Sequence, residues 1–184
     1  MIQNIKSENW QALHPFEEKA GCYQNLEREL SRAYSAPIKV VCPCEWNQTS
    51  FSWFETIEQN TFRQELRYTY SETLDRWNKQ RRLIVFILID HVPEAMIIGY
   101  DSEEPSKQIF ILDTIAVTTQ HKGIGKILMN FLIQWAREEQ FQAIVLDTEE
   151  NNERGFPLVN FYKKFGFEPF EKDNNGNVRL IRSL

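Results

Sequence analysis

The stretch between residues 109 and 147 constrains the fold more than any other part of the chain. An apolar run at 109–117 precedes a segment, 123–140, whose apolar side chains recur every three or four residues, as on one face of an amphipathic helix. A second short apolar run follows at 143–146. Strand, helix and strand in this order are most simply two parallel neighbours joined by a right-handed crossover. The segment predicts an α/β fold.

The rest of the chain extends this unit into a mixed sheet with helices on its faces. Further expected strands are short β-branched or aromatic runs bounded by turn residues, at 38–41, 83–89, 95–100, 167–170 and 178–182. Further expected helices lie near 21–34, as two or three short helices within 51–80, and at 157–165. The run at 83–89 is apolar throughout, which predicts a strand covered on both faces.

Composition and charge exclude several classes of function. The 26 acidic and 21 basic residues leave a net charge of −5, which argues against non-specific nucleic-acid binding and favours a cationic partner. The longest uninterrupted apolar run, 83–89, is far shorter than the ~20 residues that span a bilayer. The three cysteines fit neither a disulfide framework nor a zinc-ligand spacing, so we expect no metal and a cytoplasmic protein.

The loop at 120–125 has the composition of a phosphate-binding turn. Gln120-His121-Lys122-Gly123-Ile124-Gly125 lies between a strand end and a helix start, where backbone N–H groups without a helical partner favour an anion. The alternative is an ordinary tight loop whose glycines only relieve backbone strain. The spacing matches neither the dinucleotide-binding fingerprint nor the P-loop.

Two motifs in this order resemble those of the GCN5-related N-acetyltransferase (GNAT) superfamily. Gln-x-x-Gly-x-Gly after Ile115-Ala116-Val117 resembles its acetyl-coenzyme A motif, and Tyr162-x-x-x-Gly166-Phe167 resembles its late signature. The resemblance covers residues 37–184 and leaves 1–36 as a helical N-terminal extension. It implies a mostly antiparallel sheet in which one parallel strand pair is splayed, with helices on both faces.

The resemblance also implies where acetyl-coenzyme A binds. The first strand of the splayed pair would carry a bulge, and its main chain at Ile115, Ala116 and Val117 would bond pantetheine. The pyrophosphate would meet the following loop and helix start, at Gln120, His121, Lys122, Gly123, Ile124, Gly125 and Lys126. An asparagine of related enzymes matches Asn152 approximately, although the spacing from Asn152 to Tyr162 is about three residues longer here. The loop after Val117 is about two residues shorter and lacks the customary proline.

Acetyl transfer to an amine requires a base for the amine proton and a proton for the leaving thiolate. Asp147, at a strand end, is our first candidate for the base and Asp113 the second. The alternatives are a solvated or capping carboxylate at Asp147 and a charge on an exposed sheet face or bulge at Asp113. Tyr162 matches the tyrosine that faces the coenzyme sulfur in the family, and its alternative is a core tyrosine.

The predicted function is acetyl transfer from acetyl-coenzyme A to a primary amine by direct attack in a ternary complex. A non-catalytic acyl-coenzyme A-binding or regulatory domain of the same fold is the alternative. Acidic residues within 147–153 and 101–104 predict a cationic acceptor rather than a nucleic acid or a membrane. A homodimer is left open.

Overall fold

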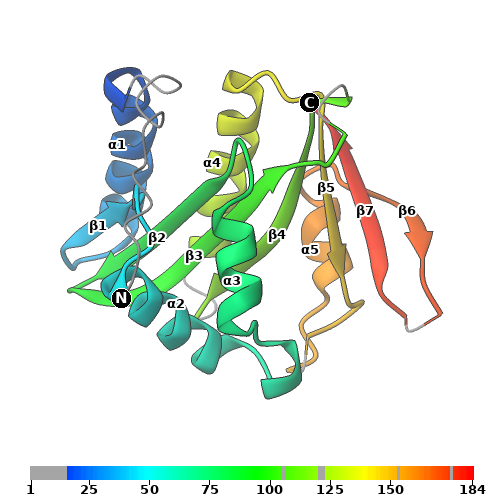
Figure 1. The fold of residues 1–184 in the computed structure, drawn as a ribbon, viewed down its shortest axis with the longest axis horizontal. Helices are drawn as coiled ribbons and strands as arrows, with labels where there is room; N and C mark the ends of the chain where they lie inside the picture. The colour runs from blue at the N-terminus through cyan, green and yellow to red at the C-terminus, as the bar shows by residue number, and fades with distance from the viewer. Residues whose placement is uncertain (1–15, 105–106, 120–122, 153, 175) are drawn as a thin grey trace, which may run out of the picture.

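The computed structural model describes residues 16–104, 107–119, 123–152, 154–174 and 176–184, and side chains from residue 23 onward (Figure 1). Its seven-stranded sheet has the order β1-β2-β3-β4-β5-β7-β6. The strands are β1 (Ile38–Val41), β2 (Leu83–Ile89), β3 (Val92–Asp101), β4 (Ile109–Val117), β5 (Ala143–Thr148), β6 (Glu168–Lys172) and β7 (Val178–Ser183). The helices are α1 (Phe16–Ala33), α2 (Gln48–Thr61), the 3-10 turn η1 (Gln64–Leu66), α3 (Tyr70–Trp77), α4 (Ile124–Glu138) and α5 (Leu158–Lys163).

The topology confirms the predicted fold class. Only β4 and β5 pair in parallel, and every other neighbouring pair in the sheet is antiparallel. The strand expected at 95–100 begins earlier than predicted, because β3 starts at Val92. Asp90 and His91 alone make the turn, with φ angles of 51° and 66°, as a two-residue hairpin requires.

Two hydrophobic cores cover the two faces of the sheet, and β2 contributes to both. Leu83, Val85 and Ile87 join the core under α1, α4 and α5, whereas Ile84, Phe86 and Leu88 join the core under α2 and α3. Side chains alternate across a strand, so a run that is apolar at every position fits only a sheet buried on both sides. The expectation from the sequence for 83–89 is confirmed.

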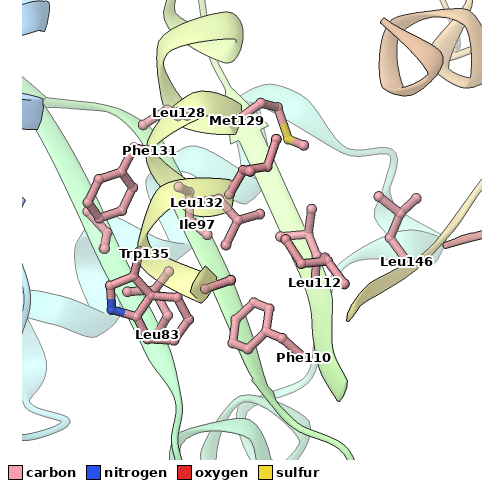
Figure 2. Close-up of a cluster of buried hydrophobic side chains, with 14 of the residues drawn as sticks. Leu83, Ile97, Phe110, Leu112, Leu128, Met129, Phe131, Leu132, Trp135 and Leu146 are labelled. Carbon is pink, nitrogen blue, oxygen red and sulfur yellow. The ribbon is translucent and has the colours of Figure 1, made fainter. Parts of the chain in front are cut away.

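Helix α4 packs along the sheet through the apolar stripe that its sequence predicts. Leu128, Leu132 and Trp135 share one buried cluster with Ile97 of β3 and Phe110 of β4 (Figure 2). The ring centroids of Trp135 and Phe110 lie 5.1 Å apart, in an edge-on arrangement. This packing holds the start of α4 at a fixed place beside the end of β4.

Helix α1 contributes to the same core as α4. Leu26 and Leu30 are 2% and 0% exposed, and the ring centroids of Tyr23 and Phe131 lie 5.8 Å apart. The backbone N–H of Val40 in β1 donates to a Glu27 carboxylate oxygen at 3.0 Å. The division of the chain at residue 36 stays a prediction.

None of the described helices combines the length and apolarity that crossing a membrane requires.

Candidate active site

A bulge in β4 changes which side chains of that strand face which side of the sheet. Ile98 pairs with Thr114 and Gly99 with Leu112, so Asp113 is an extra residue without a partner on β3. Leu112 faces the α4 core, but Ala116, four residues later, belongs to the α2–α3 core. Gly99 permits the close approach of β3 to β4 at the bulge, since a Cβ there would lie 2.3 Å from the Phe110 ring.

Beyond the bulge, β4 and β5 separate. Their pairing ends at Ile111 and Val145, and within the described residues the rest of β4 has no partner on its β5 side. Figure 1 shows the two strands side by side where they begin and diverging toward their ends. The main-chain groups of Ile115 and Val117 on that edge are therefore available to a bound molecule.

The first turn of α4 lies at the end of this opening. Its N-cap is Gly123 in the left-handed region, with φ 81°, and the first turn has no acidic side chain. The N–H groups at this end have no helical partner and favour an anion. Gly125 faces α5, since a Cβ there would lie 3.5 Å from the Phe161 ring. Of the predicted loop, Gln120, His121 and Lys122 lie outside the described residues, while Gly123, Ile124, Gly125 and Lys126 lie within them.

The connection from β4 to α4 is tied to the start of β3. Thr118 donates its backbone N–H to the Glu94 carbonyl at 2.9 Å. The Thr119 hydroxyl donates to a Glu94 carboxylate oxygen at 3.0 Å, and the Thr118 hydroxyl donates to the same oxygen. Glu94 thus holds both residues that lead into the predicted phosphate loop.

Tyr162 is buried on α5, beside the start of α4. Its ring packs against Phe161 and Phe167, with centroid distances of 5.3 and 5.9 Å. Burial raises the pKa of Tyr162 well above its ordinary value of 10, so the hydroxyl keeps its proton at neutral pH. Within the described part of the chain this hydroxyl has no hydrogen-bond partner, which leaves it able to donate to a bound group.

The carboxylates of Asp147 and Asp113 both have cationic partners. Asp147 is exposed and receives Nε and Nη2 of Arg179 on β7 at 2.8 and 2.9 Å. Asp113 is nearly buried and receives Nε of Arg76 at 2.8 Å and the hydroxyls of Tyr68 and Tyr100, each at 2.9 Å. Both carboxylates are therefore already engaged in charge-assisted hydrogen bonds.

Asn152 shapes its own loop. Its side-chain oxygen accepts the backbone N–H groups of Arg154 and Phe156 at 3.0 and 2.9 Å. A side-chain oxygen that receives two N–H groups of its own loop stabilises that loop locally. The structure therefore supplies a local role for Asn152, and its predicted contact with the coenzyme stays a prediction.

Glu58 is a buried carboxylate that the sequence analysis missed. It lies on α2 with 4% exposure, and its carboxylate accepts the backbone N–H of Tyr68 at 3.3 Å. Burial raises the pKa of Glu58 to about 7, against an ordinary value of 4.5. The available signal was position, because Glu58 follows Phe54 by four residues and shares the buried face of α2.

A hollow of about 650 Å³ lies elsewhere, on a different face of α5 from Tyr162. Its lining comes from α5, the loop after β5, and the β6–β7 hairpin, and includes Asn160, Lys163 and Glu171. Neither Tyr162 nor residues 115–117 line it, so it is separate from the opening between β4 and β5. Among the described side chains, no three metal-ligating residues gather at either place.

Comparison with known proteins identifies a family for most of the chain. Residues 45–167 match the model of the Acetyltransferase (GNAT) family. A search among curated proteins finds no match.

Solved structures with the same fold are distant in sequence. The aminoglycoside 6'-acetyltransferase type Ii superposes with a TM-score of 0.66 at 16% identity, over 79% of this chain and 96% of its own. PaiA N-acetyltransferase from Thermoplasma acidophilum, solved with coenzyme A, gives 0.63 at 14% identity over 80% and 99%. The ribosomal-protein-S18-alanine N-acetyltransferase from Escherichia coli gives 0.60 at 16% identity over 78% and 90%.

Proposed function

The chain belongs to the acetyltransferase (GNAT) family, and on that premise we propose that it transfers acetyl from acetyl-coenzyme A to a primary amine within a ternary complex. One observation supports this most directly. The strands β4 and β5 separate beside the glycine start of α4, and the buried Tyr162 lies on α5, whose Phe161 faces Gly125 in that start. The opening offers unpaired main-chain groups for pantetheine and helix N–H groups for the pyrophosphate.

Each substrate has its own side of the opening. A pyrophosphate at the start of α4 places the coenzyme on the α4–α5 side of the sheet. The amine then approaches from the α2–α3 side, where Glu58 and Asp113 lie. The amine nitrogen attacks the thioester carbon, a C–N bond forms, and the C–S bond breaks as the thiolate leaves.

Tyr162 supplies the proton that the leaving thiolate needs. A phenol whose pKa is raised by burial remains protonated and is able to donate a hydrogen bond or the proton itself. The amine proton goes to a carboxylate on the opposite side, directly or through one water molecule.

Glu58 suits the role of base better than the two aspartates, although all three stay candidates. A base at pH 7 works best with a pKa near 7, and burial gives Glu58 that value. The carboxylates of Asp147 and Asp113 are each already hydrogen-bonded to an arginine. Replacing each carboxylate by its amide should therefore remove the acidic limb of the rate–pH profile only for Glu58→Gln.

The pairing of Asp147 and Asp113 with arginines favours a second candidate function, namely a coenzyme-binding domain without turnover. The decisive measurement is release of free thiol from acetyl-coenzyme A with three amines, namely a peptide with an N-terminal alanine, spermidine and kanamycin. Catalysis predicts release with at least one amine, and a binding domain predicts none despite saturable binding of acetyl-coenzyme A by calorimetry. Absence of binding at millimolar coenzyme would contradict both.

Gly125 provides a variant for the coenzyme side. Its φ is not in the left-handed region, and a Cβ there makes only an ordinary contact with Phe161. Gly125→Val should therefore fold and yet weaken coenzyme binding by crowding the start of α4. Gly123 is less suitable, because any side chain there is strained at φ 81°.

A further inference from the structure

The connection between α2 and α3, residues 62–69, is attached to both of the strands that separate. Near its end, the Tyr68 hydroxyl donates to Asp113 in the β4 bulge at 2.9 Å. Near its start, Nη2 of Arg63 pairs with Glu149, the residue directly after β5. In Figure 1 this connection passes close to the loop that follows β5, at the bottom of the view.

Tyr68 contacts helices α2 and α3 and strand β4. Its ring stacks on Phe54 of α2 with centroids 6.4 Å apart, and the Arg76 guanidinium of α3 lies 3.7 Å over the ring. Its backbone N–H donates to Glu58, and its hydroxyl donates to Asp113. Four contacts from three elements, α2, α3 and β4, therefore fix the position of Tyr68 within the connection.

The connection also has internal order. It contains the 3-10 turn η1, and Arg67 donates from Nε to the Phe62 carbonyl at 2.8 Å and from Nη2 to the Gln59 carbonyl at 3.2 Å. These bonds close the C-terminal end of α2, where carbonyls have no helical partner. Residues 62–69 thus form a short, ordered bridge between the bulge of β4 and the residue that follows β5.

We propose that residues 62–69 form a strap across the α2–α3 side of the opening between β4 and β5, and that Asp113 and Glu149 are positioning residues that set where the acceptor amine enters. The role given to the acceptor amine rests on the proposed function, whereas the attachment of the strap to both strands does not. Asp113 then serves the reaction through Tyr68, with its carboxylate held in place by Arg76. Glu149 serves it through Arg63.

Tyr68→Phe and Tyr100→Phe form a matched pair of variants. Each removes one hydroxyl that donates to Asp113 at 2.9 Å, but only Tyr68 belongs to the strap, since Tyr100 lies on β3. In both variants the ring remains and Arg76 still pairs with Asp113. Any difference between the two variants therefore reports on the strap rather than on Asp113.

The first measurement is hydrogen–deuterium exchange of the full chain without ligand. In Tyr68→Phe the amides of residues 66–68 should exchange about tenfold faster, because a hydrogen bond to a charged group is lost from the strap. Tyr100→Phe should leave those amides unchanged. Arg63→Gln, which releases the other end, should accelerate exchange near η1 by a smaller factor, since that pair is more exposed.

The second measurement is steady-state kinetics with the best amine of the three named above. Tyr68→Phe should raise the acceptor KM about tenfold, with kcat and the acetyl-coenzyme A KM changed less than threefold, and Tyr100→Phe should leave the acceptor KM unchanged. A purely structural role would not separate the two KM values in this way. Equal effects of both variants on exchange and on the acceptor KM would overturn the strap. If the wild type releases no thiol with any amine, the proposed function fails, while the exchange experiment still decides the attachment.

Discussion

At the scale of single residues, the buried carboxylate of Glu58 makes stability depend on pH. Its pKa in the folded protein is about 7, above the ordinary 4.5, so the folded state holds a proton that the unfolded state has lost between these values. Stability contributed by this group is therefore present below about pH 4.5 and is lost as the pH rises to 7. The loss amounts to at most about 3 kcal/mol.

Glu58→Gln should remove this dependence. The amide still accepts the Tyr68 N–H but carries no charge, so the variant should match the wild type at pH 4.5 and exceed its unfolding free energy at pH 8 by up to about 3 kcal/mol. Urea unfolding at both pH values measures the difference. Glu55→Gln, an exposed glutamate on the same helix, is the control. A variant that gains nothing between pH 4.5 and pH 8 would show that Glu58 is not held protonated by burial.

Tyr162→Phe separates the hydroxyl from the ring. The ring keeps its packing with Phe161 and Phe167, and no described residue loses a hydrogen bond, so the unfolding free energy should change by less than about 0.5 kcal/mol. Acetyl-coenzyme A affinity should also change little. If the hydroxyl protonates the thiolate, kcat should fall ~10²–10⁴-fold. An unchanged kcat would assign Tyr162 to packing alone.

At the scale of elements, the connection between β4 and α4 is held by one side chain of β3. Glu94→Gln weakens the bonds from the Thr118 and Thr119 hydroxyls and should weaken acetyl-coenzyme A binding about tenfold by loosening the loop before α4. The direction of the change in affinity is diagnostic, because removing a negative charge near a pyrophosphate would by itself strengthen binding. Calorimetric Kd values, with Glu103→Gln at an 89% exposed side chain as the control, measure the effect. Tighter binding in Glu94→Gln would mean that charge, and not loop position, governs this end of the site.

At the scale of the whole molecule, α1 should unfold together with the sheet. Leu30 is fully buried in the core that α4 also builds, so Leu30→Ala should cost ~2–5 kcal/mol and move one common urea transition to a lower concentration. Circular dichroism and tryptophan fluorescence should report the same midpoint. Glu29→Ala, at an exposed position of the same helix, should have little effect. An early transition confined to helical signal would instead support an independent extension over residues 1–36.

The distribution of charge over the molecule weakens the argument for a cationic acceptor. Glu149 pairs with Arg63, and Glu150 pairs with Lys172. In the other acidic stretch, Asp101 pairs with Arg81, and Glu103 with Lys79. Paired charges produce a smaller field than their acidic members alone would, so we expect a shallow salt dependence of the rate with spermidine.

The sequence by itself determined most of the elements, and it also predicts where the coenzyme binds. The 3.6-residue period of α4, the fully apolar run of β2 and the glycine after β4 are local properties, readable within about 15 residues. The parallel pairing of β4 and β5 followed from chain order, since a crossover helix leaves few other arrangements. Local patterns of this kind can be read from a short segment without knowing which distant residues it contacts.

Only the tertiary structure decided which carboxylates have partners. Asp147 meets Arg179 across 32 residues of sequence, and Asp113 meets Tyr68 across 45. The burial of Glu58 depends in the same way on Tyr68 and on the sheet beneath α2. Ionisation and hydrogen bonding depend on which groups lie within a few ångströms, and those groups come from segments that no local pattern relates. The strap over the separated strands exists for the same reason, because both of its attachments join residues far apart in the chain.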